Sequence, residues 1–219
     1  QSIITQTQLP DKIFLYLSEE SHIFDTGFIN KDITYKNLLQ FVQENRKLIE
    51  VKWVNNEGPY RKLIPLLKQK WNDDCIIITI DDDTIYDNNL IKNLVKDYNI
   101  HGCVINYRGF TPKMNKISEF DYTKHDTIIN NYIYNFPTGK GGILYNPKFF
   151  HKTGELIFNK DIYMNTCKTT DDIWFYILRI KNNINCFISN RPWMNSDLTN
   201  GGLYTINTVN NFNTFRFHN

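Results

Sequence analysis

The sequence predicts an α/β fold in which helices flank a mostly parallel, Rossmann-like central sheet. Short apolar runs alternate with helical patterns along the first half of the chain, as in βαβ units. The run at residues 75–80 is almost wholly apolar and β-branched, which is typical of a strand buried on both faces. It ends in three consecutive carboxylates, Asp81 to Asp83, before a helical pattern begins at residue 88. We expect these acids at the carboxyl edge of the sheet, where α/β folds bind ligands.

The first half of the chain predicts a regular order of elements. Residues 1–7 read like the end of a helix, from which we expect that a first β-strand belongs before them and is missing from this chain. Pro65 is tolerated in a helix only in the first turn or at a kink. The other expected elements are strands at 12–18 and 48–54 and helices at 35–46, 60–71 and 88–98.

The second half of the chain predicts a small mixed β region. A strand at 101–109 is the last element of the alternating pattern, and β-rich, aromatic residues follow at 126–136. Further on we expect a short strand at 143–145, a helix at 170–181 and a strand at 185–189. No linker interrupts the sequence, so we expect one domain over residues 1–219.

Composition limits the classes of function. A net charge of +2 gives no strong field for nucleic acid or an anionic bilayer, and no apolar run approaches the ~20 residues of a membrane span. The four cysteines are dispersed, so we expect small core residues in a reducing, cytoplasmic compartment. The histidines lack metal-binding spacing, although His218 remains a minor candidate for a cation ligand.

The three consecutive acids suit a metal site. Carboxylate oxygens are hard ligands for Mg²⁺ or Mn²⁺, and these ions commonly bridge to phosphate oxygens. Asp81 and Asp83 point the same way if the segment is strand-like, so they could share one cation while Asp82 points opposite. The alternative is that Asp83 or Asp87 caps the following helix and the other acids are solvated.

A second acidic pair, Asp171 and Asp172, begins the helix expected at 170–181. Thr169 and Asp172 have the spacing of a capping box, in which the acid hydrogen-bonds to the cap amide. A helix start at the rim of a pocket is also a suitable place for a general base, which must reach the proton of an incoming hydroxyl. Both interpretations remain open from the sequence.

Two further segments have a possible ligand chemistry. Residues 139–142 let backbone amides approach a ligand, and Lys140 adds a positive charge, although the segment by itself favours a simple hairpin turn. Arg61 and Lys62 stand at a helix start, where they either neutralise a diphosphate or lie in solvent.

Taken in series, these motifs resemble a GT-A glycosyltransferase of the bacterial surface-polysaccharide type, similar to glycosyltransferase family 2. Order and spacing agree along residues 1–180. The Gln-x-x-Arg-Trp element of processive synthases is missing, which favours the transfer of single sugars. The matching pieces are Ser2-Ile3, Gln6-Thr7, residues 10–18, Lys62-Leu63-Ile64-Pro65, the acids 81–83, Gly141-Gly142 and Asp171-Asp172-Ile173-Trp174.

The resemblance implies a GT-A fold with a nucleotide-binding half at 1–109 and an acceptor-side half at 110–219. It implies a nucleotide-diphosphate-sugar donor, with a UDP-sugar expected first, a Mn²⁺ or Mg²⁺ ion, and a saccharide or lipid-linked saccharide acceptor. It also implies work in the cytoplasm, with association at the inner face of the membrane. The implied roles are Asp83 and Asp81 on the metal, Asp82 near the ribose or sugar, Lys62 on the diphosphate, Ser18 and Glu19 near the nucleobase, Lys140 and Gly141 near the sugar, Asp172 as base and Asp171 on the acceptor.

Two other functions fit the same residues. A sugar-phosphate nucleotidyltransferase uses a similar metal, although the Gly-rich basic loop typical of that class is not visible in this sequence. A carbohydrate-binding protein that keeps the fold without catalysis is the second alternative. For the first function, a single base opposite the leaving group predicts inversion at the anomeric carbon.

Overall fold

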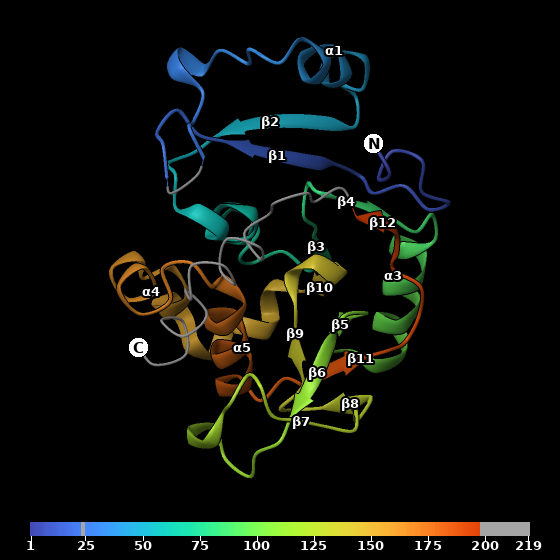
Figure 1. Ribbon diagram of the computed structural model, residues 1–219, viewed down its shortest axis with the longest axis vertical. Helices are drawn as coiled ribbons and strands as arrows, with labels where there is room; N and C mark the ends of the chain where they lie inside the picture. The colour runs from blue at the N-terminus through green and yellow to red at the C-terminus, as the bar shows by residue number, and fades with distance from the viewer. Residues whose placement is uncertain (23–24, 198–219) are drawn as a thin grey trace.

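The computed structural model describes residues 1–22 and 25–197, and Figure 1 shows how the elements are arranged. The tail beyond 197, including His218, lies outside the described residues. A five-stranded sheet of order β3-β10-β5-β11-β8 forms the centre of the fold. Its strands are β3 (Ile77–Thr79), β10 (Ile143–Tyr145), β5 (Val104–Asn106), β11 (Cys186–Ile188) and β8 (Asn131–Tyr132).

The central sheet is mixed, so the prediction of a mostly parallel sheet is wrong for it. Only β5 and β11 pair in parallel, whereas β10 runs antiparallel to both β3 and β5, and β8 runs antiparallel to β11. The reason is that β10 comes from the second half of the chain and enters between β3 and β5. The alternating pattern in the first half carried no information about this insertion. The fold is a mixed α/β structure.

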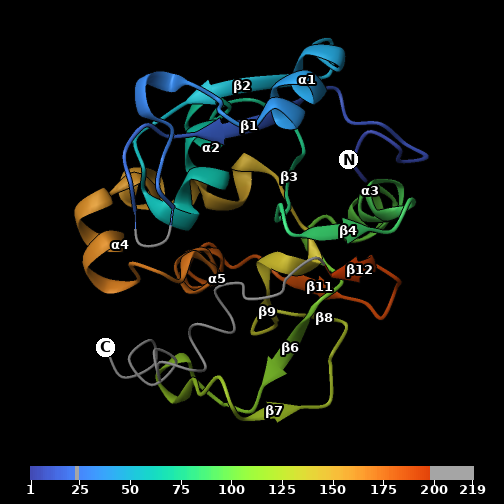
Figure 2. The same cartoon turned by 45° about the horizontal axis from the view of Figure 1, so that its top comes forward.

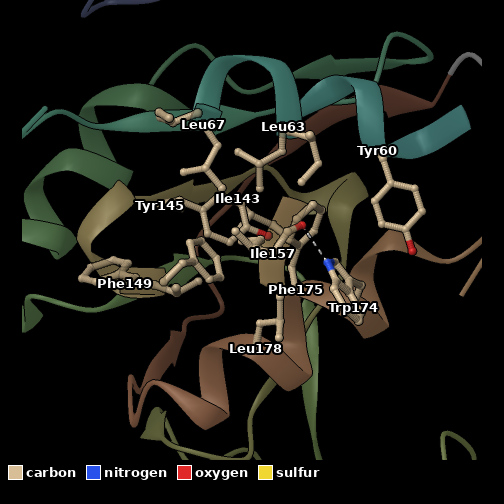
Figure 3. Close-up of a cluster of buried hydrophobic side chains, with 14 of the residues drawn as sticks. Tyr60, Leu63, Leu67, Ile143, Tyr145, Phe149, Ile157, Trp174, Phe175 and Leu178 are labelled. Carbon is tan, nitrogen blue, oxygen red and sulfur yellow. Dashed lines mark hydrogen bonds between the residues drawn. The ribbon is translucent and has the colours of Figure 1, made fainter. Parts of the chain in front are cut away.

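Helices cover both faces of this sheet. Alternate side chains of β10 point to opposite faces: Ile143 and Tyr145 join one buried cluster, and Leu144 joins the other. Figure 3 shows the first cluster, in which Trp174 Nε1 donates a hydrogen bond to the carbonyl of Ile157 at 3.2 Å. The helical elements around this cluster are η2 (Gly58–Lys62), α2 (Ile64–Gln69), η5 (Pro147–Phe158), α4 (Lys160–Thr166) and α5 (Asp171–Lys181), and α3 (Leu90–His101) covers the other face.

A separate parallel pair, β1 (Ile13–Leu17) and β2 (Ile49–Trp53), lies above the central sheet with α1 (Lys36–Glu44) beyond it (Figure 2). These elements confirm the strands and the helix predicted there. The helix predicted at 60–71 is divided into η2 and α2, and Pro65 lies in the first turn of α2. Residues 1–7 form turns, so the predicted helix end is wrong. The side chain of Gln6 instead donates to the carbonyl of Asp87 at 2.7 Å.

Two small antiparallel sheets complete the described chain. β6 (Gly109–Pro112) lies between β7 (His125–Asp126) and β9 (Phe136–Pro137), which confirms a small β region in the second half. β4 (Thr84–Tyr86) pairs with β12 (Met194–Asp197). None of the described helices combines the length and the apolar character that crossing a membrane requires.

Candidate active site

Three segments that are distant in sequence meet at one edge of the central sheet because of its register. Thr79 at the end of β3 pairs with Ile143 at the start of β10, and Ile143 pairs with Asn106 at the end of β5. The acids after β3, the glycine-rich turn before β10 and Arg108 after β5 are therefore neighbours. This is the edge where the sequence placed a ligand site, although one of the three strands runs in the opposite direction.

Lys62 lies at the centre of this edge. Its Nζ is 3.4 Å from Asp81 Oδ1 and 3.3 Å from Asp171 Oδ2. Tyr60 and Leu63, on either side of it in the chain, are fully buried in the core, and this anchors the lysine. Burial would lower the pKa of Lys62, but the carboxylates of Asp171 and Asp81 raise it well above its usual value. Lys62 is thus a permanent cation that joins the two acidic motifs, and the expectation that it lies in solvent is wrong.

Asp171 is the most buried acid of the cluster, with 7% of its side chain exposed. Burial raises its pKa to about 7; the charge of Lys62 opposes the rise and that of Asp172 adds to it. Within the described residues Asp171 Oδ2 accepts no hydrogen bond of good geometry, so its contact with Lys62 is mainly electrostatic. A buried acid without a full hydrogen-bond complement depends strongly on its counter-ion.

Asp172 is held by the glycine-rich turn. Its Oδ2 accepts a hydrogen bond from the backbone amide of Gly139 at 3.1 Å. Burial raises the pKa of Asp172, although Lys62 and the Gly139 amide oppose the rise. The N-cap of α5 is Thr170, which makes no side-chain capping bond, so the capping-box interpretation is wrong. Asp172 faces the turn because that turn supplies an amide donor.

Gly139 leaves room for the Lys62 ammonium and the Asp172 carboxylate. A Cβ at this position would lie 2.7 Å from Lys62 Nζ and 3.2 Å from Asp172 Oδ1. The turn at Gly139–Gly141 is a single 3₁₀ turn that joins β9 to β10, and these two strands belong to different sheets. The hairpin interpretation of residues 139–142 is therefore wrong.

The acids after β3 lie in a turn between β3 and β4, not in a strand. The strand-like alternation predicted for Asp81, Asp82 and Asp83 is therefore wrong. Asp82 is exposed, whereas Asp83 is partly buried and accepts a hydrogen bond from the Thr84 hydroxyl at 3.1 Å. Burial raises the pKa of Asp83 despite the Thr84 bond, and the charges of Asp81 and Asp82 add to the rise. Neither Asp83 nor Asp87 is the N-cap of α3, which is Asn89.

The turn at residues 81–83 suits a divalent ion that completes its coordination with water or phosphate oxygens. Asp81 and Asp83 are close enough for their charges to interact, and the cluster's carboxylates, at 81–83, 171 and 172, outnumber its cations, Lys62, Arg108 and Lys140. Among the residues that the structure describes, no group of three or more His, Cys, Asp or Glu forms a metal cage. Mg²⁺ commonly takes one or two carboxylates and completes its shell with water and phosphate oxygens. The residues fit that mode and do not fit a site made of protein ligands alone.

Three residues of the site were missed from the sequence. The buried Tyr86 hydroxyl accepts the amide of Asp81 at 2.8 Å and donates to the carbonyl of Lys140 at 3.1 Å, so it joins the acidic turn to the glycine-rich turn. Asn106 donates to the carbonyls flanking that turn, at Thr138 and Gly142, and Arg108 donates to the Thr138 hydroxyl at 2.7 Å. The signal for Asn106 was a lone polar residue inside an apolar strand run.

The other predicted site residues lie at different distances from the cluster. Lys140 is near enough to Asp83 for its charge to lower the pKa of that acid. Gly141 is buried, and a Cβ there would lie 2.4 Å from Arg108 Cβ, so this glycine packs behind the turn. The structure does not bring Ser18 and Glu19 to the cluster. Ser18 is buried and its Oγ accepts from Arg61, whereas Glu19 pairs with Lys31 at 3.7 Å.

No protein-family profile matches the chain, and no curated protein matches it. Among solved structures, it is similar to one from Bacillus anthracis described as a glucose-1-phosphate thymidylyltransferase in complex with a sucrose. That similarity has a TM-score of 0.44 at 15% sequence identity and covers 79% of this chain and 70% of that one. A likeness this weak shows neither a family nor an activity.

Proposed function

We propose that the protein is a metal-dependent glycosyltransferase that moves a single sugar from a nucleotide-diphosphate donor to a hydroxyl of a saccharide acceptor, as in surface-polysaccharide synthesis. One observation carries the proposal: Lys62 Nζ lies within 3.4 Å of an acid from each of the two predicted motifs, Asp81 and Asp171. A cation shared by two acidic motifs, beside a turn suited to a divalent ion, can stabilise a leaving group that gains negative charge.

The roles follow from charge and exposure. Asp83 and Asp81 would hold Mn²⁺ or Mg²⁺, and the metal would supply electrostatic stabilisation of the departing diphosphate. Lys62 would approach the same phosphates, with Lys140 near the sugar. Asp171 has almost no exposed surface for an acceptor, so we assign it the task of holding Lys62. Ser18 is buried behind Arg61, so a nucleobase would meet the backbone of this segment or Glu19.

Asp172 is the proposed base. It is more exposed than Asp171, and burial raises its pKa, which makes it a stronger base than an ordinary carboxylate. In the transfer step the acceptor oxygen forms a bond to the anomeric carbon, the bond from that carbon to the diphosphate oxygen breaks, and the bonding pair leaves with the diphosphate. The acceptor proton passes to Asp172. Attack opposite the leaving group predicts inversion.

The test begins with donor binding and turnover. Thermal shifts are recorded with UDP-, GDP-, CDP- and dTDP-sugars with and without Mn²⁺, because a ligand that binds the folded state raises apparent stability. We expect one donor to stabilise the protein only with the metal, with UDP-glucose as the first probe. Donor hydrolysis should then fall at least a hundredfold in Asp83→Ala and in Asp172→Asn. Wild-type rates in both variants would contradict the proposal.

The alternatives give different results in the same experiment. A sugar-phosphate nucleotidyltransferase would release pyrophosphate from a nucleoside triphosphate in the presence of a sugar 1-phosphate and would not hydrolyse the nucleotide sugar. A carbohydrate-binding protein would show neither reaction while a saccharide still raised its melting temperature.

A further inference from the structure

A cavity of about 410 Å³ opens beside η2, and it shares none of its lining residues with the carboxylate cluster. Lys62 belongs to the cluster, whereas the adjacent Arg61 and Ile64 line the cavity. The opposite wall comes from η5 and α4, through Phe158, Lys160 and Tyr163. The volume lies within the usual range of small-molecule sites, about 300–1,000 Å³.

The cavity carries more positive than negative charge. Three cations line it, Arg61, Lys68 and Lys160, and the acid among the lining residues is Glu57. Arg61 also pairs with Asp25, outside the lining, at 2.5 Å. Glu57 is already engaged, by Lys160 at 3.2 Å and by the Tyr163 hydroxyl at 2.6 Å. Within the described part of the chain, Lys68 pairs with no acid. Its ammonium is therefore available to an anionic ligand.

Part of the cavity lining is apolar. Ile64, Pro65 and Phe158 line it together with Tyr163, which is fixed by stacking on Tyr60 with ring centroids 4.2 Å apart. A sugar ring can place its C–H faces against such side chains and its hydroxyls against the polar ones. Aromatic and apolar walls with a few placed polar groups are the usual lining of such sites.

A second cavity of about 110 Å³ shares Val54 and Asn55 with the first, and its other lining residues are Glu19, Glu20, Lys31 and Trp53. Both lie beside the segment that follows β2. The two carboxylates, of Glu19 and Glu20, disfavour an anion in the second cavity, so the charged unit of a ligand would stay in the first cavity, beside Lys68.

We propose that this cavity binds an anionic saccharide unit, one that carries a carboxylate or a phosphate, with Lys68 as its main cationic contact. The inference rests on the proposed function only in taking this unit as part of the acceptor. The acceptor is then an acidic saccharide whose charged unit is held away from the reacting hydroxyl. The two places are connected through η2, in which Tyr60 stacks on Tyr163 of the cavity and Lys62 belongs to the cluster. The Tyr60 hydroxyl donates to the carbonyl of Cys167 at the end of α4, at 2.8 Å.

Isothermal titration of the whole protein tests the inference with four probes: glucuronate, glucose 6-phosphate, glucose and inorganic phosphate. We expect glucuronate or glucose 6-phosphate to bind at least tenfold more tightly than glucose and than inorganic phosphate. The tighter of the two acidic sugars identifies the anionic group. Lys68→Gln should weaken its binding at least fivefold. The matched change Lys92→Gln, at an exposed position on α3, should leave the affinity unchanged.

Several results would overturn the inference. Acidic sugars that bind Lys68→Gln as well as wild type, or that do not bind wild type, would remove the site. Equal affinity for inorganic phosphate would leave an anion site without saccharide recognition. Displacement of the acidic sugar by UDP would assign the cavity to the donor. Binding of the acidic sugar should persist in Asp172→Asn, because Asp172 does not line the cavity. If the wild type binds the acidic sugar through Lys68 but turns over no donor, the saccharide site stands and only its assignment to the acceptor is removed.

Discussion

Arg61 and Lys62 are adjacent in the chain, but their side chains serve two different electrostatic environments. Lys62 is enclosed by carboxylates and its charge compensates the buried Asp171. Arg61 lines an open cavity in which cations outnumber acids, and it pairs with Asp25 at 2.5 Å. The exposed fractions of the two side chains are nearly equal, 26% and 25%. Because the exposure is nearly the same, the surrounding charges and not burial distinguish the two side chains. Lys62 lies among carboxylates that outnumber cations, whereas Arg61, although paired with Asp25, lies beside a cavity lined by more cations than acids.

Lys62→Met tests this difference between the two cations with the largest expected effect. Removing the cation leaves Asp171 uncompensated, so we expect donor turnover to fall at least a hundredfold. We also expect the free energy of unfolding to fall by about 2–3 kcal/mol at pH 7, less than for a fully buried pair because a quarter of Lys62 is exposed. Urea denaturation measures the second effect.

The matched control for this change is Lys68→Met in the cavity, where stability should change by less than about 0.5 kcal/mol. The loss in Lys62→Met should also shrink at pH 5, because Asp171 is then largely protonated. Equal losses in the two variants would mean that Lys62 does not compensate a buried charge.

Asp171→Asn tests the charge environment of Lys62 through the pH dependence of the free energy of unfolding. The pKa of Asp171 is about 7 in the folded protein and 3.8 ordinarily, so between these values the folded state holds its proton more firmly than the unfolded state. This tighter proton binding stabilises the folded protein at pH 4. The stabilisation is lost as the pH rises to about 7, and the free energy of unfolding falls by at most about 4 kcal/mol. Denaturation at several pH values should show a smaller decline in the variant. An unchanged slope would show that Asp171 is not the titrating group.

Tyr86→Phe tests the smallest effect, the link between the two turns of the cluster. It removes two hydrogen bonds, so we expect a loss of about 1–2 kcal/mol and a several-fold rise in the donor KM. Tyr176→Phe is the matched control, since its buried hydroxyl donates to the carbonyl of Tyr134 away from the cluster. The control should lose stability without a change in KM. If the donor KM changed in neither variant, or changed equally in both, Tyr86 would have no specific positioning role.

The first half of the fold was readable from sequence because local signals agree there. Alternating apolar runs predicted β1, α1, β2 and α3, and the acids after β3 pointed to the edge where the cluster lies. The insertion of β10 was not readable, since strand pairing between distant segments leaves no local pattern. The contact of Lys62 with Asp171 depends on that insertion and on the packing of η2 against α5. Tyr86 was missed because a tyrosine in a short strand is ordinarily a core residue, and only the structure reveals both hydrogen bonds.

A crystal structure of the protein with UDP and Mn²⁺, with the metal located by its anomalous scattering, tests the central claim most directly. We expect a Mn²⁺ peak within about 2.2 Å of a carboxylate oxygen of Asp83 or Asp81, with the diphosphate between the metal and Lys62. A diphosphate bound in the cavity of Arg61 and Lys68, or a metal remote from the acidic turn, would contradict it.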